Sequence, residues 1–342
     1  MQPSKRFDMQ KLLAPAALVI LYIFFSLFGK NFFSTYTAKT ILESTYYIGF
    51  MAFGVTFVII TGGIDLSIGT VMNCAALIGG TAYSMWGWPL WAALLLIPLV
   101  GLLFGVGNGF MVAKLKLPPF IATLGTMLVS QGFGSIISKV QTQRFPTIGS
   151  PDGWFKTLFF RAGTFPIGAV YLFAAFLIAW FLLNQTRFGR YNFSIGSNEE
   201  AARLSGVNVN KWKILIYSVC GLFAGLAGIF YAGTYTTVLP GSGNGQELNA
   251  IAAVVIGGTS MSGGSGTMVG TLIGAFIMSV LKAGLSSMGL QAHWQTFITG
   301  FVVIGAVLLD KARTNAAAKA KTNETKEAEK AAASRASQAS KQ

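Results

Sequence analysis

Residues 45–85 read TYYIGFMAFGVTFVIITGGIDLSIGTVMNCAALIGGTAYSM, in which two apolar runs flank the segment GGIDLS at 62–67. Asp65 is the only charged side chain in this stretch. A helix needs about 20 apolar residues to cross the hydrocarbon core of a bilayer, and each run approaches that length. Because paired glycines interrupt a helix, the stretch predicts two membrane-spanning helices joined by a tight turn that carries one carboxylate.

Similar apolar runs occur along most of the chain. Together with those at 45–61 and 68–85, they lie at 12–29, 90–113, 120–137, 165–184, 214–234, 249–258, 266–287 and 294–309. The run at 249–258 has only about ten residues, too few to cross, so it either extends upstream or forms a half-helix inside the bundle. We therefore expect an all-α, polytopic membrane protein with about ten transmembrane helices.

The composition agrees with a membrane protein. Hydrophobic residues make up 53% of the 342 residues and charged residues only 11%, against roughly 25% in soluble domains. The net charge of +14 is not clustered with aromatic residues as on a nucleic-acid-binding surface, so we expect no nucleic acid partner. A cytoplasmic N-terminus places most Lys and Arg residues inside, as the positive-inside rule requires. Both termini are then expected in the cytoplasm.

This topology divides the chain into a cytoplasmic segment at 1–11, a transmembrane domain at 12–309 and a basic tail at 310–342. The tail is rich in Ala, Lys, Glu and Ser and lacks aromatic residues, so we expect it to be disordered or a frayed helix. Two hydrophilic loops are long enough to dock partners. They are 138–164, expected outside, and 185–213, expected inside.

No motif for catalysis or metal binding is present. The sequence has no phosphate-binding loop, no HExxH zinc motif and no nucleophile elbow in a soluble context. Cys74 and Cys220 lie in apolar runs, and with the single His293 they offer neither metal-ligand spacing nor a disulfide framework. We expect no enzymatic activity, no catalytic residue, no metal and no cofactor in this chain.

Glycines recur at four-residue spacing inside the apolar runs. One series is Gly101, Gly105 and Gly109, and another is Gly221 and Gly225. Small residues at this spacing let helix backbones approach closely in lipid. We interpret both series as helix-packing surfaces.

Two glycine-rich segments in different halves of the chain resemble one another. GGIDLSIG at 62–69 and GGTSMSGG at 257–264 each join two apolar runs. Paired interruptions of this kind are typical of discontinuous helices around a transport route. A chance match in a chain with 41 glycines is the alternative. Gly63, Gly257 and Gly258 are the candidate turn residues.

Asp65 is a costly residue between two spanning segments. The cost falls at a helix N-terminus, where Ser67 and the free backbone N–H groups of a helix beginning near Ile68 can donate to the carboxylate. We favour this structural cap. A proton or ion relay would need a second titratable group at membrane depth, and the one candidate, Glu247, is expected at the outer end of another run.

The inner loop contains the segment SNEEAARLSGV, which begins at Ser197 and predicts a short helix. Ser197 can cap this helix together with Glu200 in a capping box. Glu199 and Arg203 can pair at i, i+4, and Gly206 can end the helix. A helix shorter than about 12 residues is marginal in water, so this one needs a docking partner. The residues alone leave open whether that partner is the membrane domain or another protein.

Five further features follow one another along residues 45–309. They are GIDLSIG at 63–69, LPPFIATLGTM at 117–127, TRFGR at 186–190 leading into 199–209, ELNAIAA at 247–253 continuing through 257–258 to SGGSGT at 262–267, and WQ at 294–295. In this order they resemble the membrane-spanning permease subunits of bacterial ATP-binding-cassette sugar importers of the ribose, xylose, galactose and arabinose type. Five ordered matches are more specific than any one of them.

The resemblance implies a multi-pass protein of the bacterial inner membrane that carries a monosaccharide. It implies a second permease copy, identical or a close paralogue, two cassette ATPase subunits that bind ATP and Mg, and a periplasmic sugar-binding protein. In such importers a short cytoplasmic helix fits a cleft of the ATPase. The resemblance therefore assigns coupling to Glu199, Glu200, Ala201, Ala202, Arg203 and Gly206.

Sugar contacts are expected from a few polar groups among aromatic residues, because a permease served by a binding protein needs only a low-affinity route. Interhelical hydrogen bonding is the alternative role for each polar group. The candidates at membrane depth are Phe53, Phe57, Asn73, Asn108, Thr123, Thr126 and Gln131.

Other classes of function stay open. A secondary carrier would need a titratable relay near the bilayer midplane, where this chain has almost no carboxylate or histidine. A passive channel or a membrane scaffold would not need the docking helix. The residues identify neither the sugar nor the second subunit.

Overall fold

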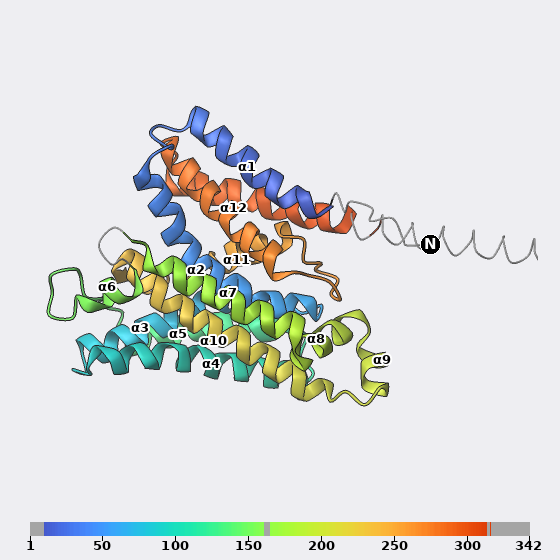
Figure 1. The fold of residues 1–342 in the computed structure, drawn as a ribbon. Coiled ribbons are helices and arrows are strands. Elements are labelled where there is room, and N and C mark those ends of the chain that lie inside the picture. The colour runs from blue at the N-terminus through green and yellow to red at the C-terminus, as the bar shows by residue number, and fades with distance from the viewer. Residues whose placement is uncertain (1–9, 161–164, 313–314, 316–342) are drawn as a thin grey trace, which may run out of the picture.

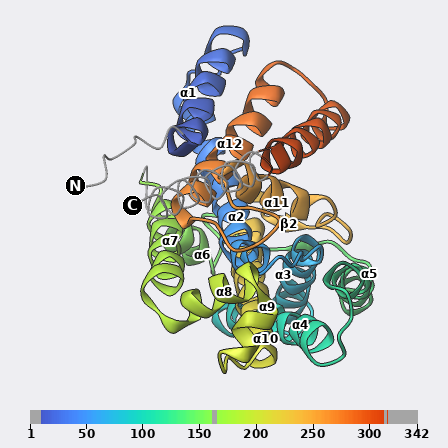
Figure 2. The same cartoon turned by 90° about the vertical axis from the view of Figure 1, so that its right-hand side faces the viewer.

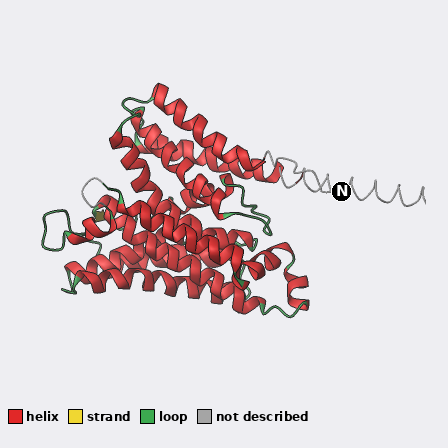
Figure 3. Cartoon of the chain, viewed as in Figure 1, coloured by secondary structure: helices red, strands yellow, loops and turns green. Residues whose placement is uncertain are grey.

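A computed structural model describes residues 10–160, 165–312 and 315 of the chain. Most of this part is helical (Figure 3). Its β structure is one antiparallel pair of two-residue strands, in which β1 (Gln143–Arg144) pairs with β2 (Thr237–Val238). The all-α prediction is confirmed.

The helices follow the expected apolar runs. The first half contains α1 (Gln10–Phe28), α2 (Thr35–Ile60), α3 (Ile68–Ser84), α4 (Leu90–Ala113), α5 (Pro119–Ile137) and α6 (Trp154–Phe159). The second half contains α7 (Ile167–Gln185), α8 (Arg187–Ser197), α9 (Glu199–Leu204), α10 (Val209–Tyr235), α11 (Gln246–Ile256), α12 (Met268–Ser287) and a terminal helix at Ala292–Ala312. Each of the ten runs coincides with a helix.

Seven of the described helices are long and apolar enough to cross a membrane. They are α2, α4, α5, α7, α10, α12 and the terminal helix. The 17 residues of α3 and the apolar part of α1 at Leu13–Phe28 are shorter. The 11 residues of α11 rise only about 16 Å, roughly half of a bilayer core. The run at 249–258 therefore forms a half-helix, one of the two outcomes that the sequence allows.

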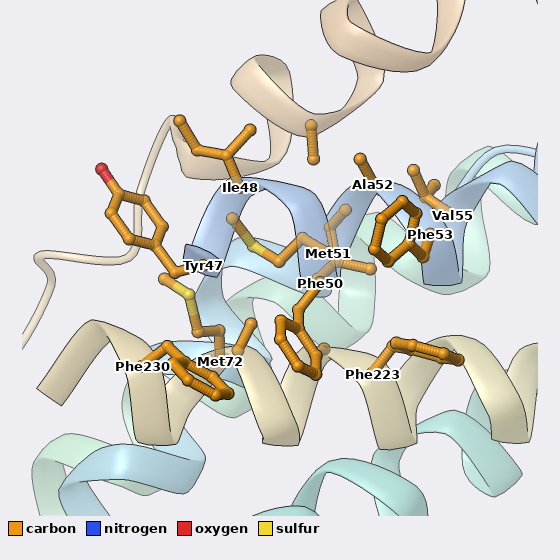
Figure 4. Packing of buried hydrophobic residues seen from close by; sticks show 14 of the residues in the cluster. Tyr47, Ile48, Phe50, Met51, Ala52, Phe53, Val55, Met72, Phe223 and Phe230 are labelled. Atoms are coloured by element: carbon orange, nitrogen blue, oxygen red, sulfur yellow. The ribbon is translucent and has the colours of Figure 1, made fainter. Parts of the chain in front are cut away.

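Helix α2 lies at the centre of the fold, between two groups of helices (Figures 1 and 2). One group contains α3, α4, α5, α7 and α10, and the other contains α1, α12 and the terminal helix. Phe50 reaches from α2 to α10, where its ring stacks on Phe230 at 4.6 Å and Phe223 flanks it (Figure 4). Large aromatic side chains thus fill the space around α2.

Both ends of the chain lie mainly outside the described residues. The structure describes only residues 10 and 11 of the expected cytoplasmic segment 1–11, and only residues 310–312 and 315 of the expected tail 310–342, all of them helical. The buried Asp310 accepts a hydrogen bond from the backbone N–H of Met261 at 3.0 Å. The terminal helix is therefore fixed to the segment that joins α11 to α12.

Helices α4 and α10 touch backbone to backbone. A Cβ atom on Gly105 would lie 2.9 Å from the Cα of Gly221, and one on Gly101 would lie 2.7 Å from the Cα of Gly225. Real Cβ atoms do not approach other atoms so closely, so the two helices can meet only where side chains are absent. The four-residue glycine spacing is confirmed as a packing surface.

This contact predicts that Gly221→Leu destabilises the protein, because the added side chain forces α4 and α10 apart. We expect a loss of about 1–3 kcal/mol, the usual cost of overpacking, and a lower thermal midpoint in detergent by size-exclusion chromatography. The matched control is Gly107→Leu in α4, where an added Cβ meets nothing within 4 Å. Equal effects of the two substitutions would contradict the packing argument.

Candidate functional site

The two similar glycine-rich turns contact each other at one end of the bundle. The backbone N–H of Gly264 donates to the carbonyl of Ile60 at 2.8 Å. A Cβ on Gly263 would lie 2.9 Å from the backbone nitrogen of Gly62. Gly62, Gly263 and Gly264 all have positive φ, which side chains disfavour. The turn between α2 and α3 and the turn between α11 and α12 therefore form one junction, called here the glycine junction (62–63 with 263–264).

Helix α8 ends on the glycine junction. A Cβ on Gly196, in its last turn, would lie 2.7 Å from the nitrogen of Gly264 and would also clash with the carbonyl of Ile60. One turn earlier, Asn192 is fully buried, and neither its amide nitrogen nor its amide oxygen has a partner among the described residues. Helix α8 therefore packs directly on the backbone of both turns, with no side chain between them.

Helix α9 follows α8 after a single residue. Asn198 is extended and its side chain accepts from the N–H of Ala201 at 2.9 Å, so Asn198 is the N-cap. The expected cap, Ser197, is wrong, because Ser197 is still the last residue of α8. The expected end is confirmed: Gly206 has φ +84, and Val207 N–H donates to the carbonyl of Ala202 at 3.1 Å, a Schellman motif.

A small apolar cluster holds α9 against its neighbours. Ala202 packs there with Ile195 of α8 and Val209 of α10. Glu199 pairs with Arg203 at 3.1 Å, as expected, and with Lys213 of α10 at 2.6 Å. Burial alone would raise the pKa of Glu199, but the hydrogen bond and charge of Lys213, helped by the other nearby cations, keep it below its usual value. Glu199 therefore stays ionised and ties α9 to α10.

The rest of α9 faces away from the bundle. Glu200, Ala201, Arg203 and Gly206 are exposed, and Leu204 is 82% exposed. The outward face of α9 thus combines charged side chains with one apolar side chain. Among the coupling candidates, only Ala202 is buried in the protein itself.

Asp65 is the centre of a buried hydrogen-bond network. Its Oδ1 accepts from the backbone N–H of Ser67 at 2.9 Å and from the Ser67 hydroxyl at 2.6 Å. Asn108 of α4 donates to Ser67 Oγ at 2.9 Å, and its amide nitrogen lies 3.4 Å from Asp65 Oδ2. Thr126 of α5 donates to the Asn108 amide oxygen at 2.5 Å. The expected cap is not observed, because Ser67 is the N-cap residue of α3, which begins at Ile68, and it makes no side-chain cap hydrogen bond. Asp65 instead closes a turn onto Ser67 directly before the helix.

The remaining candidates for sugar contacts lie in three places. Thr123 donates to the carbonyl of Pro119 at 2.9 Å, within its own helix. Phe53 and Phe57 are fully buried in the aromatic core around α2. Asn73 and Gln131 lie beside the segment 239–245: Asn73 donates to the carbonyl of Leu239 at 3.1 Å, and Gln131 is near Gly241. Asn73 and Gln131 therefore share one polar region, whereas Asn108 and Thr126 belong to the Asp65 network.

A groove of about 610 Å³ opens between α4 and α5. Its lining includes Phe104, Met111, Ile121 and Phe133, and Thr126 is its one hydroxyl-bearing residue among those described. A sugar needs several convergent polar groups, which this groove lacks. The groove is an apolar surface rather than a sugar site.

Glu247 lies at the beginning of its own helix, in the first turn of α11, where it is buried. This end of α11 packs against Gly69, in the first turn of α3. Glu247 therefore lies close to the helix that follows Asp65, a contact that the sequence does not predict. The signal in the sequence for the start of α11 is GSGNG at 241–245, whose last glycine has φ +83 directly before α11.

The network predicts different outcomes for two substitutions of Asp65. Asp65→Leu leaves the Ser67 N–H and hydroxyl without an acceptor, and we expect a loss of about 2–4 kcal/mol of stability. Asp65→Asn keeps one acceptor oxygen, and asparagine closes the same turn onto the backbone two residues on, so the loss should stay below about 1 kcal/mol. Thermal unfolding of the purified protein in detergent measures both. Equal damage by Asn and Leu would show that the negative charge itself is required.

Comparison with known proteins identifies the family. The model of the family described as branched-chain amino acid transport system / permease component matches residues 37–307. The ribose import permease RbsC of Escherichia coli K12 is 40% identical over 301 residues, which cover 86% of this chain and 91% of the relative. The fructose import permease FrcC of Rhizobium meliloti is 36% identical over 309 residues (87% and 86%). The galactose/methyl galactoside import permease MglC of Haemophilus influenzae is 36% identical over 275 residues (76% and 82%). No solved structure matches the chain. The chain therefore belongs to the family of transport-system permease components whose model spans most of its length.

Proposed function

We propose that this chain is the permease subunit of an ATP-binding-cassette importer that carries a monosaccharide across the bacterial inner membrane. The family description names branched-chain amino acids, but the relatives reported above are named as importers of ribose, fructose and galactose. Their identity of 36–40% over most of the chain supports a sugar as the substrate.

The observation that carries the proposal is the exposed face of α9. Two turns of helix are too short to be stable in water without packing. The structure anchors one face of α9 through Ala202 and Glu199 and leaves Leu204 exposed. A cassette ATPase on the cytoplasmic side would cover Leu204 and the exposed side chains near it.

The contacts of α8 explain how the ATPase could act on the route of the sugar. Displacement of α9 moves α8, whose Gly196 touches the glycine junction without an intervening side chain. The junction connects α2 to α3 and α11 to α12. ATPase closure would then favour one of two arrangements of these helices, and release would favour the other, which is the coupling that alternating access requires.

The other components follow from this role. ATP and Mg bind to the ATPase subunits, so the permease itself holds no cofactor and catalyses no reaction. A periplasmic sugar-binding protein delivers the substrate at the opposite face, and a second permease, identical or closely related, completes the pair. The N- and C-termini lie in the cytoplasm.

A secondary carrier is the second candidate function. The observation in its favour is that two buried carboxylates, Asp65 and Glu247, lie beside the first turns of α3. Such a carrier would move sugar in liposomes without any ATPase.

Leu204→Asp tests the docking face. The side chain is exposed, so the substitution leaves the fold intact, while a carboxylate in an apolar contact is costly. We expect the recovery of co-expressed cassette ATPase in a detergent pull-down to fall by more than about tenfold, because burying an unpaired carboxylate in the interface costs at least about 2 kcal/mol.

The matched control for this pull-down is Ile148→Asp. Ile148 is 71% exposed in the loop that joins α5 to α6, which lies at the other end of the bundle from α9 (Figure 1). It should leave ATPase recovery unchanged. Equal recovery with Leu204→Asp and wild type would contradict docking through α9, and no recovery with any ATPase, combined with sugar uptake by the protein alone, would favour the carrier.

Glu200→Lys combined with Gly206→Pro tests coupling. Gly206 has φ +84, which proline cannot adopt. The Schellman motif that ends α9 is therefore lost. We expect sugar uptake in cells and stimulation of the ATPase to fall together by at least about tenfold, while the amount of permease in the membrane stays unchanged. Intact uptake would show that α9 does not couple the ATPase to sugar transport.

A further inference from the structure

The backbone between α10 and α11 is irregular and partly buried: Gly243 is buried, whereas Leu239 is 50% exposed. Helix α10 ends at Tyr235, and Thr236, Gly241 and Gly245 all have positive φ before α11 begins. Non-helical backbone at membrane depth is tolerated only where protein buries it or where it lines a polar cavity. The segment 239–245 is therefore a candidate lining of the transport route.

Polar side chains from two helices meet this segment. The Asn73 amide of α3 donates to the carbonyl of Leu239 at 3.1 Å and accepts from the Ser242 hydroxyl at 2.9 Å. The hydroxyl of Tyr231 of α10 donates to the carbonyl of Ser242 at 3.4 Å. Amide and phenol groups thus lie on both sides of the break.

Glu247 provides an acceptor that nothing in the described protein uses. The residue is only 7% exposed, and its Oε1 accepts from the N–H of Gly245 at 3.0 Å. Its Oε2 is buried and has no hydrogen-bond partner among the described residues. This oxygen points at Gly69, where a side chain would collide with it. Because an unpaired buried carboxylate oxygen is costly, it is expected to acquire a partner during the working cycle.

Donors lie nearby in a cluster of tyrosines around one lysine. Lys282 of α12 donates to the hydroxyls of Tyr47 at 2.8 Å and Tyr235 at 3.0 Å. The ring of Tyr231 lies 5.3 Å from that of Tyr47 and 4.8 Å from that of Tyr235. Tyr231 therefore joins this cluster to Ser242 and the break before α11.

The groups around the break suit a neutral polyol better than a cation. A carboxylate accepts from hydroxyl groups, while amides, phenols and an aromatic face supply the remaining contacts with a sugar. A metal ion would need several anionic or histidine ligands, and the described residues contain no cluster of three such groups. The positive charge of Lys282, which contacts Tyr47 and Tyr235 beside Tyr231, also repels a second cation.

We propose that the Glu247 carboxylate binds hydroxyl groups of the transported sugar, with Asn73 and Tyr231 beside it. This proposal rests on the proposed function and adds to it the place where sugar is held. Both helices that flank Glu247 connect through short turns to the glycine junction: α3 begins at Ile68, after Gly63, and α11 ends at Ile256, before Gly263. A movement of α8 would therefore be transmitted to the bound sugar through α3 on one side and α11 on the other.

Glu247→Gln tests the site with the smallest change in shape. The amide replaces one acceptor oxygen by a donor, so paired hydroxyl groups lose one acceptor. We expect the initial rate of uptake to fall by at least about tenfold, the effect of losing a hydrogen bond to a charged group. Cells that express the complete importer are supplied with radiolabelled ribose, fructose or galactose at a concentration below saturation. Recovery of the ATPase in the pull-down should match wild type.

The matched control is Leu248→Ala, on the next residue of α11, whose side chain is 40% exposed and outside the polar region. It should retain wild-type uptake. If Glu247→Gln imports sugar as wild type does, or loses uptake only because ATPase recovery is lost, the proposed sugar site is contradicted. The proposed importer function is not contradicted by that result. If wild type imports none of the three sugars although its ATPase binds, the proposed sugar function falls and the site falls with it.

Discussion

The arrangement of this protein depends on a backbone contact between two turns that lie about 200 residues apart in the sequence. Gly264 donates to Ile60, and Gly196 of α8 rests on both. Without side chains at these positions, three segments meet at van der Waals distance. Rigid backbone contact transmits displacement better than long side chains do, because no rotamer can absorb the movement. The junction thus makes α2, α3, α8, α11 and α12 respond together.

Local patterns predict the elements, and long-range packing decides how they meet. Apolar length finds every long helix, and EEAARL followed by Gly206 finds α9 and its end. The cap is missed because α8, an amphipathic helix in a segment expected to be a loop, extends through Ser197 and leaves only Asn198 to cap. The contact of Glu247 with Gly69 of α3 is missed because apolar length does not show which helices pack against each other.

Two buried carboxylates near the start of α3 differ in their hydrogen bonding. Asp65 has donors on both oxygens, from Ser67 and Asn108, and so fixes the turn to α4 and α5. Fully satisfied networks of this kind rigidify a structure. Glu247 satisfies one oxygen and leaves the other unpaired. The difference separates a residue that holds the fold from one that is free to meet a ligand, although both look alike as rare acids in an apolar sequence.

The unpaired oxygen of Glu247 also affects which arrangement of the helices is favoured when no sugar is bound. With no ligand, burial of Glu247 Oε2 disfavours the arrangement described here relative to one in which water reaches the oxygen. A sugar hydroxyl would remove that penalty, so sugar binding would favour this arrangement. By linkage, an ATPase that shifts the arrangement through α9 would change the sugar affinity by the same factor. Because a single hydrogen bond contributes only about 1.5–3 kcal/mol when one partner is charged, the site would stay weak enough to release its sugar. A permease that receives its substrate from a separate binding protein needs this combination, strong coupling with modest affinity.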